Sequence, residues 1–172
     1  TIHKISKKVD SGDILIQKKF KINNNETGYE LHNRAMRLGL NMLKKNFTNI
    51  IHNKLKSTKQ KKLGSQYGRL PKSNKIKWSS SSINIYNRYR VYAYPFKGSY
   101  SFIKNRKIYI NRMKIINKNN DSNDIGEINR VYSDHSFDVK CKHGYIKILN
   151  YSFSKKLTNF ETRNYIKEGN LL

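Results

Sequence analysis

The strongest constraint on the fold lies in the second half of the chain, where short apolar stretches alternate with polar breaks. Each stretch is rich in β-branched or aromatic residues and is bounded by turn-forming residues, a pattern that is typical of β-strands. Strands are expected over residues 99–104, 108–116, 126–132, 137–141 and 145–151. Five short strands in succession predict a small β-barrel domain.

An amphipathic helix is predicted in the first third of the chain. Thr27 and Glu30 have the spacing of a capping box, which supplies hydrogen-bond partners at a helix start. Apolar residues then follow at the spacings of one helix face. They are Leu31, Ala35, Leu38, Met42, Leu43, Ile50 and Ile51. We expect this helix to cover the sheet formed by the strands that precede it.

A connection separates this helix from the β-rich half. Between residues 54 and 77 the apolar pattern gives way to Lys, Ser, Gln, Gly and Pro, which is typical of an inter-domain segment. Ser79 to Ser82 can then cap a second helix, which Pro95 ends. The predicted organisation is a first region over residues 1–54, a linker over 55–77, and a helix with a β-barrel over 78–172.

The first seventeen residues follow the order strand, acidic glycine turn, strand. Asp10-Ser-Gly-Asp13 lies between Val9 and the apolar run 14–16. Glycine at position 12 permits a tight turn, and the turn leaves a carboxylate at the end of a strand. From these features alone, an ordinary β-turn is the expected interpretation.

The net charge of +25 indicates an anionic partner, such as RNA or an anionic membrane surface. However, the lysines are spread evenly and accompany many Asn, Ile and Tyr residues, a mixture expected of an AT-rich coding sequence. Cys141 is the single cysteine, which excludes an internal disulfide and a cysteine-based zinc site. No long apolar run or signal peptide is present, so we expect a cytoplasmic protein without a membrane segment and without a metal site.

Several motifs together resemble the folate-dependent formyltransferases, a family that includes the sugar-nucleotide N-formyltransferases and methionyl-tRNA formyltransferase. Thr1-x-His3 followed by the Asp10 turn and Gln17 is similar to the end of their catalytic domain. Similar segments follow in the family's order. They are Gln66-Tyr-Gly-Arg-Leu-Pro71, Ile76-Lys-Trp78, the stretch 85–100, Gly126-Glu-Ile128, Gly144-Tyr-Ile-Lys-Ile148 and Gly169-Asn-Leu171.

The resemblance implies a fold and a division of roles. The chain would form the C-terminal, α/β part of a Rossmann-like catalytic domain, followed by a small OB-like β-barrel. Asp10 matches the family's catalytic carboxylate, which assists proton transfer from the attacking amine. Ser6 and Lys7, with Asp10, match the loop that binds the folate of 10-formyltetrahydrofolate. His3 and Gly12 match supporting positions.

A further residue, Arg90, would face the anionic substrate in the cleft between the domains. An equal alternative is that Arg90 only seals the domain interface by stacking on aromatic rings. The family's Asn and His, which stabilise the oxyanion, have no counterpart in these 172 residues. We therefore expect the chain to be part of a longer enzyme and to be inactive alone.

The acceptor amine stays open between two members of the family. The Tyr-Gly-Arg-x-Pro motif at residues 67–71 and His3 favour a nucleotide-linked amino sugar. The net charge favours methionyl-tRNA. A third interpretation, from a different class, is a basic β-barrel module that binds RNA and resembles the family by chance. The resemblance also implies a homodimer.

Overall fold

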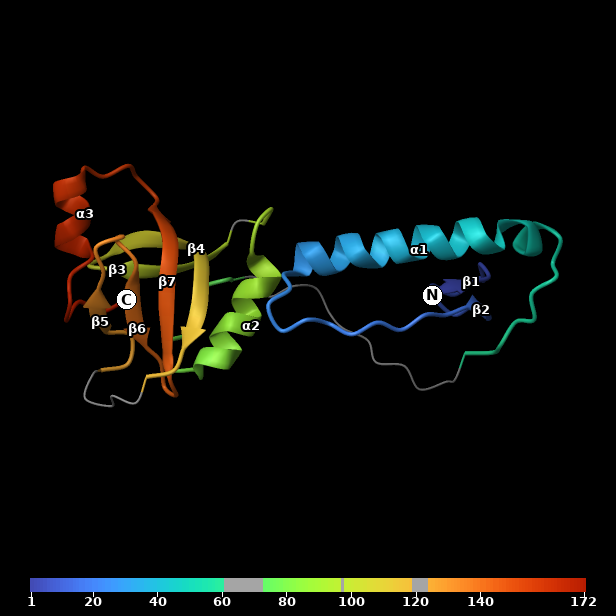
Figure 1. The fold of residues 1–172 in the computed structure, drawn as a ribbon, viewed down its shortest axis with the longest axis horizontal. Helices are drawn as coiled ribbons and strands as arrows, with labels where there is room; N and C mark the ends of the chain where they lie inside the picture. Colours follow the sequence, from blue (N-terminus) through green and yellow to red (C-terminus); the bar gives the residue numbers. More distant parts are fainter. Residues whose placement is uncertain (61–72, 97, 119–123) are drawn as a thin grey trace. The chain divides into compact units, whose positions relative to one another are not determined.

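The computed structural model describes residues 1–60, 73–96, 98–118 and 124–172 (Figure 1). The chain divides into two compact units. Unit 1 contains Thr1–Glu26 and Glu30–Leu70, and unit 2 contains Thr27–Tyr29 and Pro71–Leu172.

Unit 1 is built on a short hairpin. Strand β1 (Ile2–His3) pairs with β2 (Ile14–Ile16) in antiparallel orientation, and the register shifts between Ile2 and His3. On the other edge of β2, Ile14 and Thr58 exchange two backbone hydrogen bonds, both 2.8 Å long. Residues from the beginning of the predicted linker therefore pair with the same strand as the N-terminus.

Helix α1 (Gly28–Ile51) begins directly after Thr27, where the sequence predicts a helix start. Within unit 1 its Leu38 and Met42 line a cavity of about 270 Å³ together with Ile16 of β2, so the helix covers the hairpin as expected. Some residues of the predicted apolar stripe do not face the hairpin. The prediction is wrong for Leu43 and Ile51, which are 40% and 58% exposed, because they point to a different side of the helix from the buried Met42.

Unit 2 contains the second predicted helix, α2 (Ser82–Tyr92). The Ser81 hydroxyl caps its start by accepting a hydrogen bond from the backbone N–H of Asn84 at 3.4 Å. The helix ends before the Tyr94–Pro95 peptide bond, which is cis. Its Ile85 and Tyr89 side chains are buried in the core of unit 2.

All five predicted strands are present. They are β3 (Ser99–Ile103), β4 (Arg106–Ile116), β5 (Ile128–Val131), β6 (Phe137–Lys140) and β7 (Tyr145–Phe153). They form an antiparallel sheet in the order β3-β4-β7-β6-β5. Within the described ranges, the edge strands β3 and β5 are not hydrogen-bonded to each other, so the structure shows an antiparallel sheet rather than a closed barrel.

The core of unit 2 lies between this sheet and α2. Its centre consists of side chains with no exposed surface, which include Ile108, Ile110, Phe137, Val139, Cys141, Ile146 and Ile148. Trp78 is 6% exposed in the same cluster, and its indole N–H donates to the Ser101 hydroxyl at 3.0 Å. This bond satisfies the polar atom of a buried aromatic side chain.

A third helix, α3 (Asn159–Tyr165), was not predicted. It begins with a capping box in which the Thr158 hydroxyl accepts from the Glu161 N–H, and the Glu161 carboxylate accepts from the Thr158 N–H at 2.9 Å. The Glu161 carboxylate accepts hydrogen bonds from both the N–H and the hydroxyl of Thr158, and these lower the pKa of Glu161. Among the described helices, none is long and apolar enough to cross a membrane.

Candidate functional site

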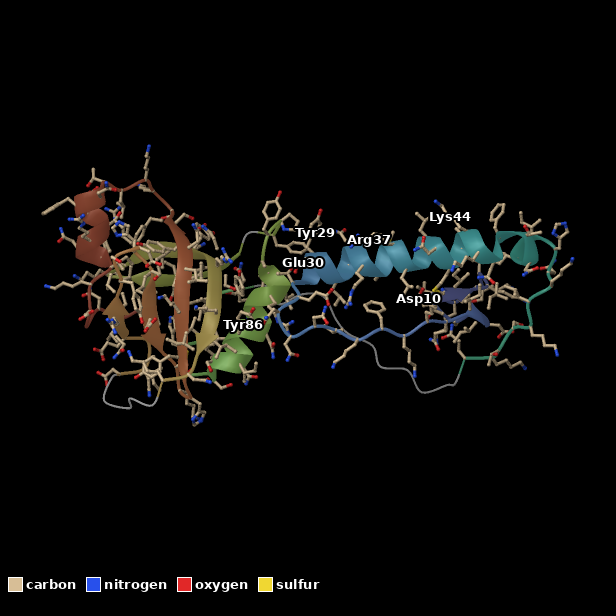
Figure 2. All side chains as sticks on the ribbon, viewed as in Figure 1. Asp10, Tyr29, Glu30, Arg37, Lys44 and Tyr86 are labelled. Atoms are coloured by element: carbon tan, nitrogen blue, oxygen red, sulfur yellow. The ribbon has the colours of Figure 1, made fainter. Side chains whose placement is uncertain are left out.

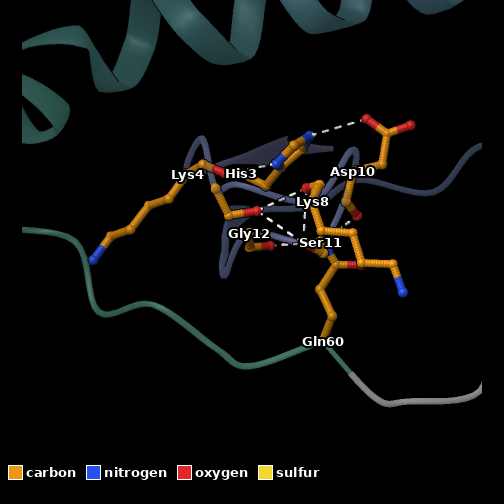
Figure 3. Close-up of polar contacts among 8 residues, drawn as sticks. His3, Lys4, Lys8, Asp10, Ser11, Gly12 and Gln60 are labelled. Atoms are coloured by element: carbon orange, nitrogen blue, oxygen red, sulfur yellow. Dashed lines mark hydrogen bonds and ion pairs between the residues drawn. The ribbon is translucent and has the colours of Figure 1, made fainter.

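The Asp10 carboxylate extends from the turn between β1 and β2 in unit 1 (Figures 2 and 3). Its side chain is 87% exposed, and its Oδ1 lies 3.8 Å from the His3 Nε2. The His3 Nδ1 lies 2.9 Å from the Lys4 carbonyl oxygen. Because a carbonyl can only accept, Nδ1 carries a hydrogen, and Nε2 is the atom that can take up a proton beside Asp10.

Asp10 itself has an unusual backbone conformation. Its φ is 51°, in the left-handed region that non-glycine residues rarely adopt, although Asp tolerates it better than most. Such a conformation costs roughly 1 kcal/mol and persists only where the surroundings impose it. The turn must therefore contain interactions that hold Asp10 in place.

Two hydroxyls and one carbonyl supply part of this support. The Ser6 and Ser11 hydroxyls lie 2.8 Å apart, and both lie within hydrogen-bond distance of the Lys8 carbonyl, at 2.9 and 2.8 Å (Figure 3). The Lys4 N–H also donates to the Asp13 carbonyl at 2.9 Å. These bonds close the loop that leads from β1 to Asp10.

Gly12 allows the two sides of this loop to approach closely. It is buried, and a Cβ atom at this position would lie 1.7 Å from the Lys4 carbonyl oxygen. No side chain fits at that distance without moving the backbone. The missing side chain of Gly12 therefore lets the loop close, and its supporting role at the active site stays a prediction.

Gln60 completes the turn, and sequence reasoning did not identify it. Its side-chain amide donates to the carbonyls of Asp10 at 3.0 Å and Gly12 at 2.6 Å (Figure 3). Nearby, the Ser57 hydroxyl donates to the Asp13 carboxylate at 3.4 Å. Residues 57–60 lie in the polar stretch interpreted as a loose linker, and no periodicity or motif marks them as partners of the turn.

The predicted site residues of unit 1 are brought together. His3, Ser6, Asp10 and Gly12 are joined by the contacts above, and Lys7 is exposed in the same loop. The folate-binding role assigned to Ser6, Lys7 and Asp10 stays a prediction. Among the described residues, no group of three His, Cys, Asp or Glu side chains is arranged to hold a metal ion.

Arg90 belongs to unit 2, near the end of α2. Its Nη2 donates to the Asn87 side-chain oxygen at 2.7 Å, and its guanidinium lies 5.8 Å from the centre of the Tyr86 ring. Stacking on an aromatic ring is the arrangement expected if Arg90 has a packing role. Its predicted contact with an anionic substrate stays a prediction. The motif at residues 66–71 lies outside the described residues.

Unit 2 contains a separate concavity of about 540 Å³ beside β7 and α3. Its apolar lining includes Leu149, Tyr151 and Ile166, and its cationic lining includes Lys155, Lys156 and Arg163. The lining also contains Asp134, whose carboxylate accepts from the Ser136 hydroxyl and N–H, and these bonds lower its pKa. An anionic ligand would meet mainly positive charge here.

The antiparallel sheet of unit 2 lies in the part of the chain that identifies its class, the formyl transferases. Residues 70–163 match the model of the formyl transferase C-terminal domain, and the chain therefore belongs to the formyltransferase family.

The curated relatives include two differently named proteins. The chain is 33% identical over 117 residues to the bifunctional polymyxin resistance protein ArnA of Wigglesworthia glossinidia brevipalpis, a match that covers 67% of this chain and 18% of that protein. It is 29% identical over 181 residues to the methionyl-tRNA formyltransferase of Caldicellulosiruptor saccharolyticus, covering 100% of this chain and 56% of that protein.

A solved structure of a formyltransferase is also similar to this chain. The sugar 3N-formyltransferase WlaRD, crystallised in the presence of dTDP and 5-N-formyl-THF, superimposes with a TM-score of 0.63 at 25% identity. The match covers 90% of this chain and 54% of WlaRD. The chain thus spans about half the length of this protein and of the methionyl-tRNA formyltransferase, and a smaller part of ArnA.

Proposed function

We propose that this chain forms the C-terminal part of an enzyme that transfers a formyl group from 10-formyltetrahydrofolate to a primary amine. The observation that carries the proposal is the Asp10 carboxylate, held on a closed turn with its Oδ1 3.8 Å from the His3 Nε2. Asp10 makes no hydrogen bond through its carboxylate within the described part of the chain. It is therefore available to accept a proton.

The folate donor supplies the activated formyl group when it is bound. As the amine forms its new C–N bond, its nitrogen must lose a proton, and the folate nitrogen must gain one as its bond to the formyl carbon breaks. Asp10 can receive the first proton directly or through water. The oxyanion donors would come from a segment outside these 172 residues.

The first candidate acceptor is a nucleotide-linked amino sugar. The similarity to WlaRD and the Tyr-Gly-Arg-x-Pro motif at residues 67–71 support it. The second candidate is methionyl-tRNA. It is supported by the match to a methionyl-tRNA formyltransferase, which covers all of this chain and 56% of that protein, and by the cationic concavity at Lys155, Lys156 and Arg163. An RNA-binding role without catalysis, a homodimer and a cytoplasmic location stay predictions.

The test joins this chain to the upstream half of the Caldicellulosiruptor relative and measures formyl transfer to a dTDP-linked amino sugar and to methionyl-tRNA. We expect Asp10→Asn to lower kcat by about 10²- to 10⁴-fold, the range of general acid–base catalysis. Asp13→Asn is the matched control, because Asn can still accept from Ser57. An Asp10→Asn enzyme with full activity would contradict the assignment, and so would formyl transfer by the 172-residue chain alone.

A further inference from the structure

Gln60 occupies a specific position behind the proposed catalytic carboxylate. Its amide group reaches the backbone on both sides of Ser11, at Asp10 and at Gly12, which lie 50 and 48 positions earlier in the sequence. An amide nitrogen has two hydrogens, and both are used when each carbonyl receives one. Gln60 thus binds two carbonyls of the turn, one on each side of Ser11, with one side chain.

The backbone around Gln60 explains how a polar side chain from the linker reaches the turn. The two hydrogen bonds between Ile14 and Thr58 align residues 57–60 along the end of β2. Thr58 lies two positions before Gln60, and Ile14 lies two positions after Gly12. The two segments run antiparallel through the Ile14–Thr58 pair. Gln60 therefore lies opposite the turn at Gly12.

We propose that Gln60 is a positioning residue, which holds the Asp10 turn in its left-handed conformation and so keeps the Asp10 carboxylate beside His3. This inference rests on the proposed function of Asp10. Gln60 contacts backbone carbonyls and acts on the reaction only through Asp10. Without its two donors, the backbone at Asp10 can relax toward a more common conformation, and the carboxylate then leaves the His3 imidazole.

The first test uses NMR on the 172-residue chain. The Cε1–Hε1 signal of His3 reports the position of the neighbouring carboxylate, and Asp10→Asn should shift it. Gln60→Ala should shift the same signal, and Gln60→Glu at least as far, because a carboxylate would face two carbonyl oxygens without a hydrogen to donate. Lys59→Ala, an exposed neighbour, is the control that should leave the signal unchanged. An unmoved His3 signal in both Gln60 variants would overturn the proposal.

The second test is a double-mutant cycle in the joined enzyme described above. Gln60→Ala should lower kcat roughly tenfold with little change in KM, because a misplaced catalytic group slows the chemical step. In the Asp10→Asn background, Gln60→Ala should not lower kcat further, because the carboxylate that Gln60 positions is already absent. An equal loss in both backgrounds would indicate a merely structural role and overturn the proposal.

The two tests separate the inference from the function on which it rests. If Asp10→Asn retains full activity, the assignment of Asp10 fails, whereas a shifted His3 signal in Gln60→Ala still shows that Gln60 positions the turn. If Asp10→Asn is inactive and Gln60→Ala behaves as wild type in both tests, the function stands and the positioning role is wrong.

Discussion

The Lys4 carbonyl oxygen occupies the space that a side chain at Gly12 would need, at 1.7 Å from the Cβ position. Gly12→Ala should therefore open the Asp10 turn and lower the free energy of unfolding of unit 1 by at least about 2 kcal/mol, as for other overpacked sites. Urea denaturation followed by the helical signal of α1 would measure this loss.

Gly39 offers a matched control within the same unit. It lies inside α1, and a Cβ at this position meets no atom within 4 Å. Gly39→Ala should stabilise unit 1 by about 0.5–1 kcal/mol, because alanine loses less backbone entropy in a helix. A similar effect of both substitutions would contradict the steric role of Gly12.

The buried hydrogen bond between Trp78 and Ser101 predicts a cost for removing its acceptor. Ser101→Ala leaves the indole N–H of Trp78 without a partner in the core and should destabilise unit 2 by about 1–3 kcal/mol. Denaturation monitored by Trp78 fluorescence measures this directly. Ser154→Ala, at an exposed position, should change stability by less than about 0.5 kcal/mol.

The thiol of Cys141 has no exposed surface, and burial raises its pKa to about 12. In the unfolded chain the pKa returns to about 8.5, so the unfolded state loses its proton first as the pH rises. The stabilising contribution of the neutral thiol is complete below pH 8.5 and is lost progressively up to pH 12. Urea midpoints between pH 7 and pH 11 should fall less steeply in Cys141→Ala than in the wild type.

Tyr132 donates its hydroxyl hydrogen to the buried Asp138 carboxylate at 2.8 Å, and this bond raises the pKa of Tyr132. In Asp138→Asn the pKa should fall toward its ordinary value of 10, because the negatively charged acceptor is gone. Titration of ¹³C-labelled tyrosine by NMR would follow the change.

Tyr151 serves as the internal reference for this titration. Its pKa is raised by burial, without a contribution from Asp138. It should therefore keep its raised pKa in Asp138→Asn. A parallel fall at both tyrosines would indicate that the substitution loosens the sheet as a whole.

Much of the fold could be predicted from the local pattern of the sequence. The segments that become β3 to β7 are rich in β-branched and aromatic residues, and the breaks between them contain turn-forming residues. Their positions therefore follow from residue type and turn signals, even for β6, in which every residue is buried. The start of α1 follows from Thr27 and Glu30 in the same way. Closure into a barrel depends on the tilt and stagger of whole strands, which short-range pattern does not specify.

The other differences between the predicted and the observed structure also have physical causes. Periodicity places Leu43 and Ile51 near an apolar face, but the side of α1 that is covered depends on the position of β2. Helix α3 is short and lacks a buried residue, so only the Thr158–Glu161 capping box could have revealed it. For the candidate site, the motif around the turn predicts Asp10, Gly12 and His3. Gln60 was missed because its partners are distant backbone carbonyls. Every residue has such a carbonyl, so residue type does not indicate which ones Gln60 binds.

Trp78 is the single tryptophan of the chain and Cys141 its single cysteine, and both are buried in unit 2. Fluorescence and thiol accessibility therefore report on unit 2 alone, whereas most of the helical signal comes from α1. Transitions that coincide for all three signals would mean that the two units unfold cooperatively. Separate transitions would give each unit its own stability, measured on the unmodified chain.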